Sequence, residues 1–202
     1  MKKFSLILLF LSVTLLGYSQ ITGTAHDFSG SAWNTTGRIC IVCHTPHNAD
    51  LTVATAPLWN HEVTAFTPYT LYSSATLNAT VGQPGDESKL CLSCHDGTVA
   101  LENFGGTTTG TNHITGPALV GTDISDDHPI SFTYDAALAT ADGGLFDPTT
   151  TNSGLGSTIS ADMLFAGRME CASCHDVHDD INGFFLRVDN AGSALCLTCH
   201  NK

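Results

Sequence analysis

The sequence predicts a fold made mostly of irregular coil, with a few short helices and little or no sheet. Residues 103–113 (NFGGTTTGTNH) and 141–158 (ADGGLFDPTTTNSGLGST) consist of turn- and loop-forming residues without hydrophobic periodicity. Short helices are expected just before residues 91 and 196, because both positions follow residues that cap helices. The candidate caps are Asp86 in the first case and Asp189, Asn190 or Ser193 in the second.

The N-terminal segment MKKFSLILLFLSVTLLGYSQ has the features of a secretory signal peptide. Lys2 and Lys3 form a basic region, an apolar run covers residues 4–16, and Gly17 and Ser19 supply small residues before a cut. The run is short for a membrane anchor, which is the alternative interpretation. We expect a signal peptide over 1–19 and a mature, exported domain over 20–202 with no membrane span.

The balance of charge excludes one class of partner. The chain of 202 residues carries 19 Asp plus Glu against 7 Lys plus Arg. A surface that binds phosphates needs clustered Lys and Arg, so nucleic acid is not expected as a partner. The length suits one domain of moderate size.

All eight cysteines fall in one repeated pattern, C-x-x-C-H, which is the attachment signature of c-type haem. The four copies, called motifs one to four below, are CIVCH (40–44), CLSCH (91–95), CASCH (171–175) and CLTCH (196–200). Disulfides would be usual in an exported chain, and paired cysteines can also bind zinc. Neither alternative explains the four histidines. We therefore expect four covalent c-type haems and no disulfides.

The spacing of the motif suits this chemistry. On one helical turn, positions i, i+3 and i+4 lie on one face, so both thiols reach the haem edge and the histidine reaches the iron. The thioether-forming residues are Cys40, Cys43, Cys91, Cys94, Cys171, Cys174, Cys196 and Cys199, and the proximal iron ligands are His44, His95, His175 and His200. The polypeptide is then expected to wrap around four stacked haems, whose apolar surface replaces a conventional core.

Each iron needs a second axial ligand, and histidine is plentiful. The six histidines outside the motifs are His26, His47, His61, His113, His128 and His178. Met163 and Met169 are alternatives that would raise the haem potential. We favour four bis-histidine haems, which leaves two of the six histidines for surface or hydrogen-bonding roles.

The motifs form two similar pairs. Motifs one and three continue to a second histidine three residues on, in CHTPH (43–47) and CHDVH (174–178), whereas motifs two and four read LCLSCH and LCLTCH. This is an internal repeat. Haem pair one is assigned to residues 26–135 and haem pair two to 160–202.

His47 cannot bind the far face of its own haem, because it follows the iron ligand His44 by three residues and the porphyrin lies between. If the repeat is taken literally, His178 reaches a haem of pair one. His47 then reaches the equivalent haem of a preceding subunit. Such a head-to-tail contact does not close on itself and produces an open polymer. The alternative is that His47 binds a haem of its own subunit and the protein is a monomer.

The chain resembles the doubled C-x-x-C-H multihaem cytochromes, and more closely the extracellular tetrahaem cytochromes of the OmcE type, which polymerise into conducting filaments. The resemblance rests on HDFSG (26–30), CHTPHNA (43–49), PLWNH (57–61), LCLSCHDGTVA (90–100), DDHPISFTYD (126–135), ECASCHDVH (170–178) and ALCLTCHNK (194–202). It implies a continuous haem stack and a histidine, best assigned to His47, that coordinates a neighbour's haem. The implied distal ligands are His26, His47, His128, His178 and His61, of which His61 is the first in doubt as a packing residue. His113 matches none of these phrases.

These features predict long-range electron transfer through closely packed haems, in which the protein fixes distance, ligand and potential. The expected partners are copies of the same chain, upstream cytochromes and an extracellular electron acceptor. The expected location is extracellular or at the cell surface, with the periplasm as the alternative. Two other functions stay open: a monomeric periplasmic electron carrier, and a multihaem reductase, which would need one iron with an open face. Enzyme activity is not expected.

Overall fold

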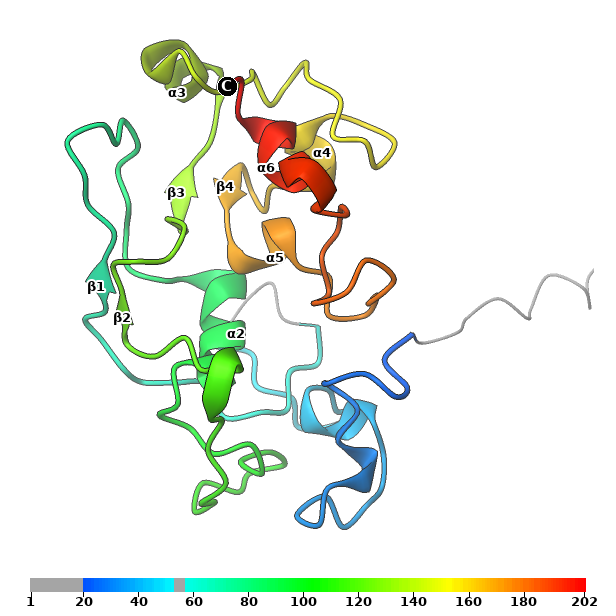
Figure 1. Ribbon diagram of the computed structural model, residues 1–202. Helices are drawn as coiled ribbons and strands as arrows, with labels where there is room; N and C mark the ends of the chain where they lie inside the picture. The colour runs from blue at the N-terminus through cyan, green and yellow to red at the C-terminus, as the bar shows by residue number, and fades with distance from the viewer. Residues whose placement is uncertain (1–19, 53–56) are drawn as a thin grey trace, which may run out of the picture.

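The computed structural model describes residues 20–52 and 57–202, so the predicted signal peptide (1–19) lies outside the described residues. Most of the described chain is loop and turn, which confirms the prediction of an irregular fold with a few short helices (Figure 1). The α-helices are α2 (Asp86–His95), α3 (Ala136–Asp142), α4 (Ile159–Asp162), α5 (Cys171–Cys174) and α6 (Ala194–Cys199). Short 3₁₀ helices cover Phe28–Gly30, Cys40–Val42, Gly116–Ala118 and Ala191–Ser193. None of the described helices has the length and apolar character that crossing a bilayer requires.

The sheets in the described chain are small. Strand β1 (Thr70–Leu71) pairs in parallel with β2 (Asp123–Ile124). Strand β3 (Phe132–Thr133) pairs in antiparallel register with β4 (Arg168–Met169), with Phe132 opposite Met169. The second pairing matters for the haem motifs, because β4 leads directly into α5.

Helix α2 begins one residue earlier than a cap at Asp86 would require. The N-cap position belongs to Gly85, whose backbone is extended, and Asp86 is the first helical residue. The capping prediction was therefore wrong here, although the helix itself was expected. Before α6, Ser193 occupies the N-cap position but makes no capping hydrogen bond, since its φ of 65° is left-handed. Asp189 instead accepts a hydrogen bond from the backbone N–H of Ala191 at 3.1 Å.

Helix α3 was not expected, because the segment between the two haem pairs was interpreted as coil. Its signals are nevertheless local. The side chain of Asp135 accepts a hydrogen bond from the N–H of Leu138 at 2.8 Å, and Gly143 ends the helix with a φ of 70°. An acidic N-cap and a left-handed glycine are typical of helix ends.

Buried apolar side chains form two clusters, and each one supports a haem motif. The larger cluster joins β3, β4, α3, α4 and α6, and its buried members are Phe132, Tyr134, Ala139, Ile159, Met163, Leu164, Met169 and Cys199. The smaller cluster contains Tyr69, Leu92 and Ile124 and lies beside α2. The clusters therefore hold motifs two and four in place.

Candidate haem sites

Each C-x-x-C-H motif forms one helical turn. In motifs one, three and four the N–H of the histidine donates to the carbonyl of the first cysteine, as in the 2.8 Å bond from His44 to Cys40. Motif two occupies the last turn of α2. Two sulfur atoms and an imidazole thus share one face of each turn. All eight cysteines are free thiols, and their sulfur atoms stand in for the thioether sulfurs of attached haems.

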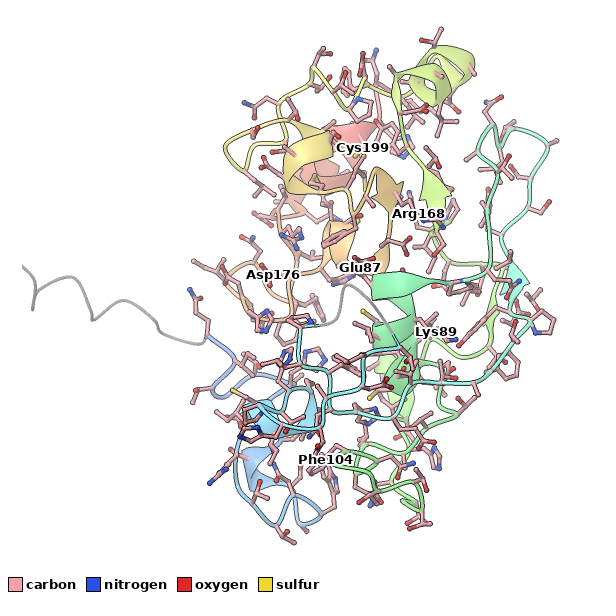
Figure 2. All side chains as sticks on the ribbon, turned by 180° about the vertical axis from the view of Figure 1, so that it is seen from behind. Glu87, Lys89, Phe104, Arg168, Asp176 and Cys199 are labelled. Carbon is pink, nitrogen blue, oxygen red and sulfur yellow. The ribbon has the colours of Figure 1, made fainter. Side chains whose placement is uncertain are left out.

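The motifs follow one another through space in sequence order. The turn at residues 40–42 lies toward one end of the molecule, α2 and α5 lie in the middle, and α6 lies toward the other end (Figure 1). The view from behind agrees with this order (Figure 2). Cys199 of motif four and Phe104 lie toward opposite ends of the molecule, and Lys89 of α2 lies between them.

Neighbouring motifs bring their sulfur atoms together. The interaction between the thiols of Cys91 and Cys171 is the main cause that raises the pKa of Cys91 and lowers the pKa of Cys171. This contact joins motifs two and three. Thioether formation removes both thiol protons, so neither cysteine titrates in the haem-bearing protein. The pKa shifts therefore indicate only that the two attachment points are adjacent.

At the other two junctions the cysteines are near enough for their charges to affect each other's pKa. Burial raises the pKa of Cys94 to about 12, and the nearby thiol of Cys43 adds to the rise, which joins motifs one and two. Burial raises the pKa of Cys199 to about 11, and Cys174 adds to it, which joins motifs three and four. Haems attached at these cysteines would form a row in the order of the motifs.

The proximal histidines are oriented for metal binding. In motifs one, two and three the ring Nδ1 lies 2.7 to 2.9 Å from a backbone carbonyl oxygen. The pairs are His44 with Pro57, His95 with Ala118 and His175 with Phe184. A carbonyl accepts only from a protonated Nδ1, so each contact fixes the tautomer whose Nε2 is free to bind iron.

The loops after motifs one and three fold back in the same way, as the internal repeat predicts. After motif one, the N–H of Thr45 donates to Leu58 at 2.9 Å, and the N–H of Asn60 donates to Cys43 at 2.9 Å.

After motif three, the N–H of Asp176 donates to Phe185 at 2.7 Å, and the N–H of Arg187 donates to Cys174 at 2.9 Å. Leu58 and Phe185, at matching places, have φ values of 55° and 57°. The repeat is therefore structural as well as sequential.

Three motif histidines each face a second histidine, and the distance between the two ring centroids is nearly the same in all three pairs. The ring centroids are 6.1 Å apart for His44 and His178, 6.0 Å for His95 and His26, and 6.3 Å for His200 and His128. Each pair contains one motif histidine and one histidine from elsewhere. The interplanar angles are 19°, 87° and 75° respectively.

This separation suits two imidazoles that share one iron. A metal–imidazole bond is about 2 Å long, and a ring nitrogen lies about 1 Å from the centroid, so two axial ligands have centroids about 6 Å apart. Ordinary aromatic contacts also fall in this range. What distinguishes these pairs is that the same combination occurs three times, always with one motif histidine.

Within the described residues, three predicted ligands, His175, His47 and His61, face no second histidine at the separation of the three pairs. All ten histidines lie within the described residues, and no second histidine ring among them faces His175 at the separation of the three pairs. The side chain of His47 is exposed and follows the loop after motif one. His113, expected to be spare, is also exposed.

His61 has a different environment from the other predicted ligands. It is 2 % exposed, and its Nδ1 lies 2.9 Å from the carbonyl of Glu62, while Nε2 lies 3.1 Å from that of Ala100 and 3.5 Å from Sγ of Cys94. Burial lowers the pKa of the ring, so the neutral ring donates from one nitrogen only. Both ring nitrogens face neighbouring groups, as they would in a packing role.

Two further alternatives can be compared with the structure. Met163 and Met169, the alternative axial ligands, are buried in the larger apolar cluster. Zinc would need converging donors, and the described residues contain no group of three or more His, Cys, Asp or Glu side chains placed to hold a metal ion. The arrangement of paired imidazoles beside cysteine pairs favours haem.

Orphaned polar atoms also fit a bound haem. Among the described side chains, His26 Nδ1 and Trp59 Nε1 are buried without a hydrogen-bond partner. Such groups cost about 1–3 kcal/mol each when they stay unpaired. Burial and the neighbouring His95 lower the pKa of His26 to about 4. A neutral imidazole is the form that binds iron, and haem carboxylates can accept from the orphaned donors.

Comparison with known proteins agrees for the C-terminal part of the chain. Residues 164–202, which contain motifs three and four, match the family model of the doubled CXXCH motif. No curated protein matches the chain. The doubled motif indicates covalent c-type haem and suggests electron transfer, which is consistent with a multihaem c-type cytochrome.

Proposed function

We propose that the protein carries electrons over long distances through four bis-histidine c-type haems, as a head-to-tail polymer outside the cell. Haems 1 to 4 denote the groups attached to motifs one to four. The observation that carries the proposal is the set of three facing histidine pairs, which leaves His175 and His47 as the remaining candidates for a shared iron.

The geometry of the facing rings supports three of the proposed ligand pairs. Haem 1 takes His44 and His178, haem 2 takes His95 and His26, and haem 4 takes His200 and His128. Haem 3 takes His175 and, from a neighbouring copy of the chain, His47. His61 is left out because its ring is buried and both ring nitrogens lie against other groups of the chain.

The internal repeat supports the ligand from a neighbour. His178 stands three residues after the iron ligand of motif three, and its ring faces His44 of motif one. His47 stands at the same place after motif one, so its equivalent target is the iron ligand of motif three in another copy. The contact that joins the two repeats within one chain would then join successive chains, and it would propagate without closing.

Exposed apolar side chains lie beside both proposed partners. Leu51 and Leu58, in the loop that carries His47, are 81 % and 53 % exposed. Ile181 and Phe184, in the loop after His175, are 78 % and 87 % exposed. Apolar side chains of this size are usual where surfaces become buried on association. A head-to-tail contact would cover one loop with the other.

The chain's own residues give the haems their properties. A bound haem iron supplies one-electron chemistry. The cysteine pairs fix each haem to its turn, and the adjacency of Cys43 with Cys94, Cys91 with Cys171, and Cys174 with Cys199 keeps successive haems close. The Nδ1 contacts to carbonyls make the proximal imidazoles better donors, which favours the ferric state. Two imidazole ligands give a lower potential than imidazole with methionine.

The remaining parts of the proposal concern location and partners. A secretory signal peptide would export the chain, upstream cytochromes would supply electrons, and an acceptor outside the cell would take them. The chain is acidic, with a formal net charge of −12, which would repel phosphate groups, so nucleic acid is not among the proposed partners.

One observation favours a second candidate, a reductase. If His175 keeps its iron without a second protein ligand, haem 3 has an open face where a small molecule could bind. A monomeric carrier differs from both, because it would need all four irons filled within one chain.

The test combines mass, spin state and size. We expect the intact mass of residues 20–202 plus four haems, fully low-spin spectra that carbon monoxide scarcely changes, and filaments in material sheared from cells. Stoichiometric carbon monoxide binding to one haem in the assembled protein would support the reductase. Native mass of a single chain with no carbon monoxide binding would support the carrier. A mass short of four haems would overturn the whole proposal.

A further inference from the structure

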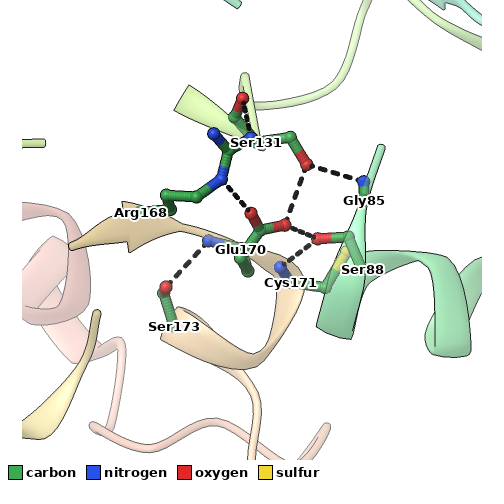
Figure 3. Close-up of polar contacts among 7 residues, drawn as sticks. All are labelled: Gly85, Ser88, Ser131, Arg168, Glu170, Cys171 and Ser173. Carbon is green, nitrogen blue, oxygen red and sulfur yellow. Dashed lines mark hydrogen bonds and ion pairs between the residues drawn. The ribbon is translucent and has the colours of Figure 1, made fainter. Parts of the chain in front are cut away.

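A buried ion pair lies at the junction of motifs two and three. The side chain of Glu170 is fully buried, and its Oε1 lies 3.0 Å from Nε of Arg168, whose side chain is 34 % exposed. The Nη2 of Arg168 also donates to the carbonyl of Ser131 at 2.6 Å. Arg168 belongs to β4 and Glu170 directly follows that strand (Figure 3).

Two buried serines complete the environment of the carboxylate. The hydroxyls of Ser88 and Ser131 both donate to Oε2 of Glu170, the second at 2.8 Å. Ser88 is 0 % exposed and Ser131 is 1 % exposed. An ionised carboxylate only accepts hydrogen bonds, and here it meets one guanidinium and two hydroxyl donors. We refer to Glu170, Arg168, Ser88 and Ser131 as the Glu170 cluster.

The Glu170 cluster connects the attachment points of two haems. Ser88 lies on α2, one turn before Cys91, and Glu170 is the residue before Cys171. The hydroxyl of Ser88 also accepts from the N–H of Cys171 at 3.0 Å (Figure 3). Since Ser88 of α2 binds both Glu170 and the N–H of Cys171, the carboxylate lies next to the place where haems 2 and 3 would meet.

We infer that the buried carboxylate of Glu170 lowers the reduction potentials of haems 2 and 3. The inference rests on the proposed function, because it needs haems at motifs two and three. A buried negative charge stabilises a ferric haem, which carries one more positive charge than a ferrous haem. Arg168 opposes this effect, but its greater exposure lets solvent screen it more than Glu170.

The two charges predict shifts of opposite sign. In Glu170→Gln the guanidinium is left without its carboxylate, so the potentials of haems 2 and 3 rise. In Arg168→Gln the carboxylate is left without its guanidinium, so both potentials fall at pH 8. Each change should alter the equilibrium constant for reduction by on the order of tenfold, as expected of one unit charge in a protein interior. Arg168→Lys keeps the charge and should leave the potentials close to those of the wild type.

The experiment is a potentiometric titration of the full haem-bearing protein, followed by visible absorption and low-temperature electron paramagnetic resonance. Asp123→Asn is the control, because it removes a carboxylate that is exposed. A purely structural role would move Glu170→Gln and Arg168→Gln in the same direction. Shifts in one direction, or shifts no larger than those of Asp123→Asn, overturn the inference.

Two readouts keep this result separate from the proposed function. The intact mass of each variant shows whether four haems are attached, and a wild type without four haems would overturn the proposed function itself. If Glu170→Gln does not fold, Arg168→Gln and Arg168→Lys still decide the inference, because Arg168 is partly exposed. An unchanged potential in a four-haem Arg168→Gln protein then overturns it.

Discussion

The imidazole rings of His44 and His178 lie 6.1 Å apart, with their planes inclined by 19°. The two residues come from different halves of the internal repeat, and each half contributes one ring to the pair. This relationship links the repeat to the proposed function, because a ligand from the loop after motif three would complete a site begun by motif one. It also identifies His47 as the residue with the same place in the repeat and no facing ring among the described residues.

Replacement of His47 should affect assembly and one haem. His47→Ala should keep four attached haems, because Cys40, Cys43 and His44 remain. One haem in four should become high-spin or change its ligand, since haem 3 loses its donor from the neighbouring copy. Filaments should give way to short species. Intact mass, absorption spectra and electron microscopy measure these three outcomes.

His113→Ala is the matched control for that experiment. Both residues are exposed histidines on loops, and His113 faces no motif histidine at axial separation within the described chain. It should leave spin state and filament length unchanged. Normal filaments with fully low-spin haems in His47→Ala would show that another residue makes the bridge.

His61 should behave as a core residue. His61→Phe should leave all haems low-spin, but the free energy of unfolding should fall by about 1–3 kcal/mol, because the carbonyl that accepts from the ring N–H, of Glu62 or of Ala100, loses its donor. His128→Ala, in contrast, should convert one haem to a high-spin form, because haem 4 loses its second axial ligand. Denaturant unfolding and absorption spectra compare the two variants. A high-spin haem in His61→Phe would restore His61 as an axial ligand.

The ring orientations predict two kinds of ferric spectrum. The splitting of the iron d orbitals depends on the angle between the two imidazole planes. Haem 1, with ligand planes 19° apart, should give a rhombic low-spin signal. Haems 2 and 4, at 87° and 75°, should give a signal dominated by one large g value. Electron paramagnetic resonance of the oxidised protein should resolve both kinds. A single kind for all haems would contradict the ligand geometry.

Ser88, an uncharged member of the Glu170 cluster, should contribute to the free energy of unfolding. Its hydroxyl donates to Glu170 and accepts from the N–H of Cys171. Ser88→Ala leaves buried partners unpaired and should lower the free energy of unfolding by about 1–3 kcal/mol. Ser74→Ala, at an exposed serine in a loop, should have little effect. Equal stabilities of the two variants would indicate that the hydroxyl of Ser88 is replaced by water.

The local features of the fold could be predicted from the sequence. The attachment motifs, the helix that ends at His95 and the irregular loops follow from composition and spacing. The helical turn at Cys40–Val42 is only a 3₁₀ turn, and its N-cap residue Ile39 makes no capping side-chain hydrogen bond. Helix α3 was missed although Asp135 and Gly143 signalled it, because the surrounding Gly- and Thr-rich sequence was interpreted as one continuous loop.

The long-range features could be predicted only in part. That His178 faces a motif of pair one follows from the repeat, but nothing local indicates that His26 faces His95 or that His128 faces His200. These pairs depend on how loops cross the whole molecule. The Glu170 cluster was missed for the same reason. Its serines come from separate segments, and only the acidic residue before Cys171 was visible as an unusual neighbour of a haem motif.

The order of the facing histidines along the chain has a topological consequence. An iron shared by two histidines closes a loop, as a disulfide does, and restricts the unfolded chain. The three loops, 26–95, 44–178 and 128–200, each overlap the next one, so none can open without disturbing its neighbour. The two halves of the repeat would therefore not unfold separately. Heat or denaturant should melt the haem-bearing chain in a single transition, and neither half expressed alone should reach its native coordination.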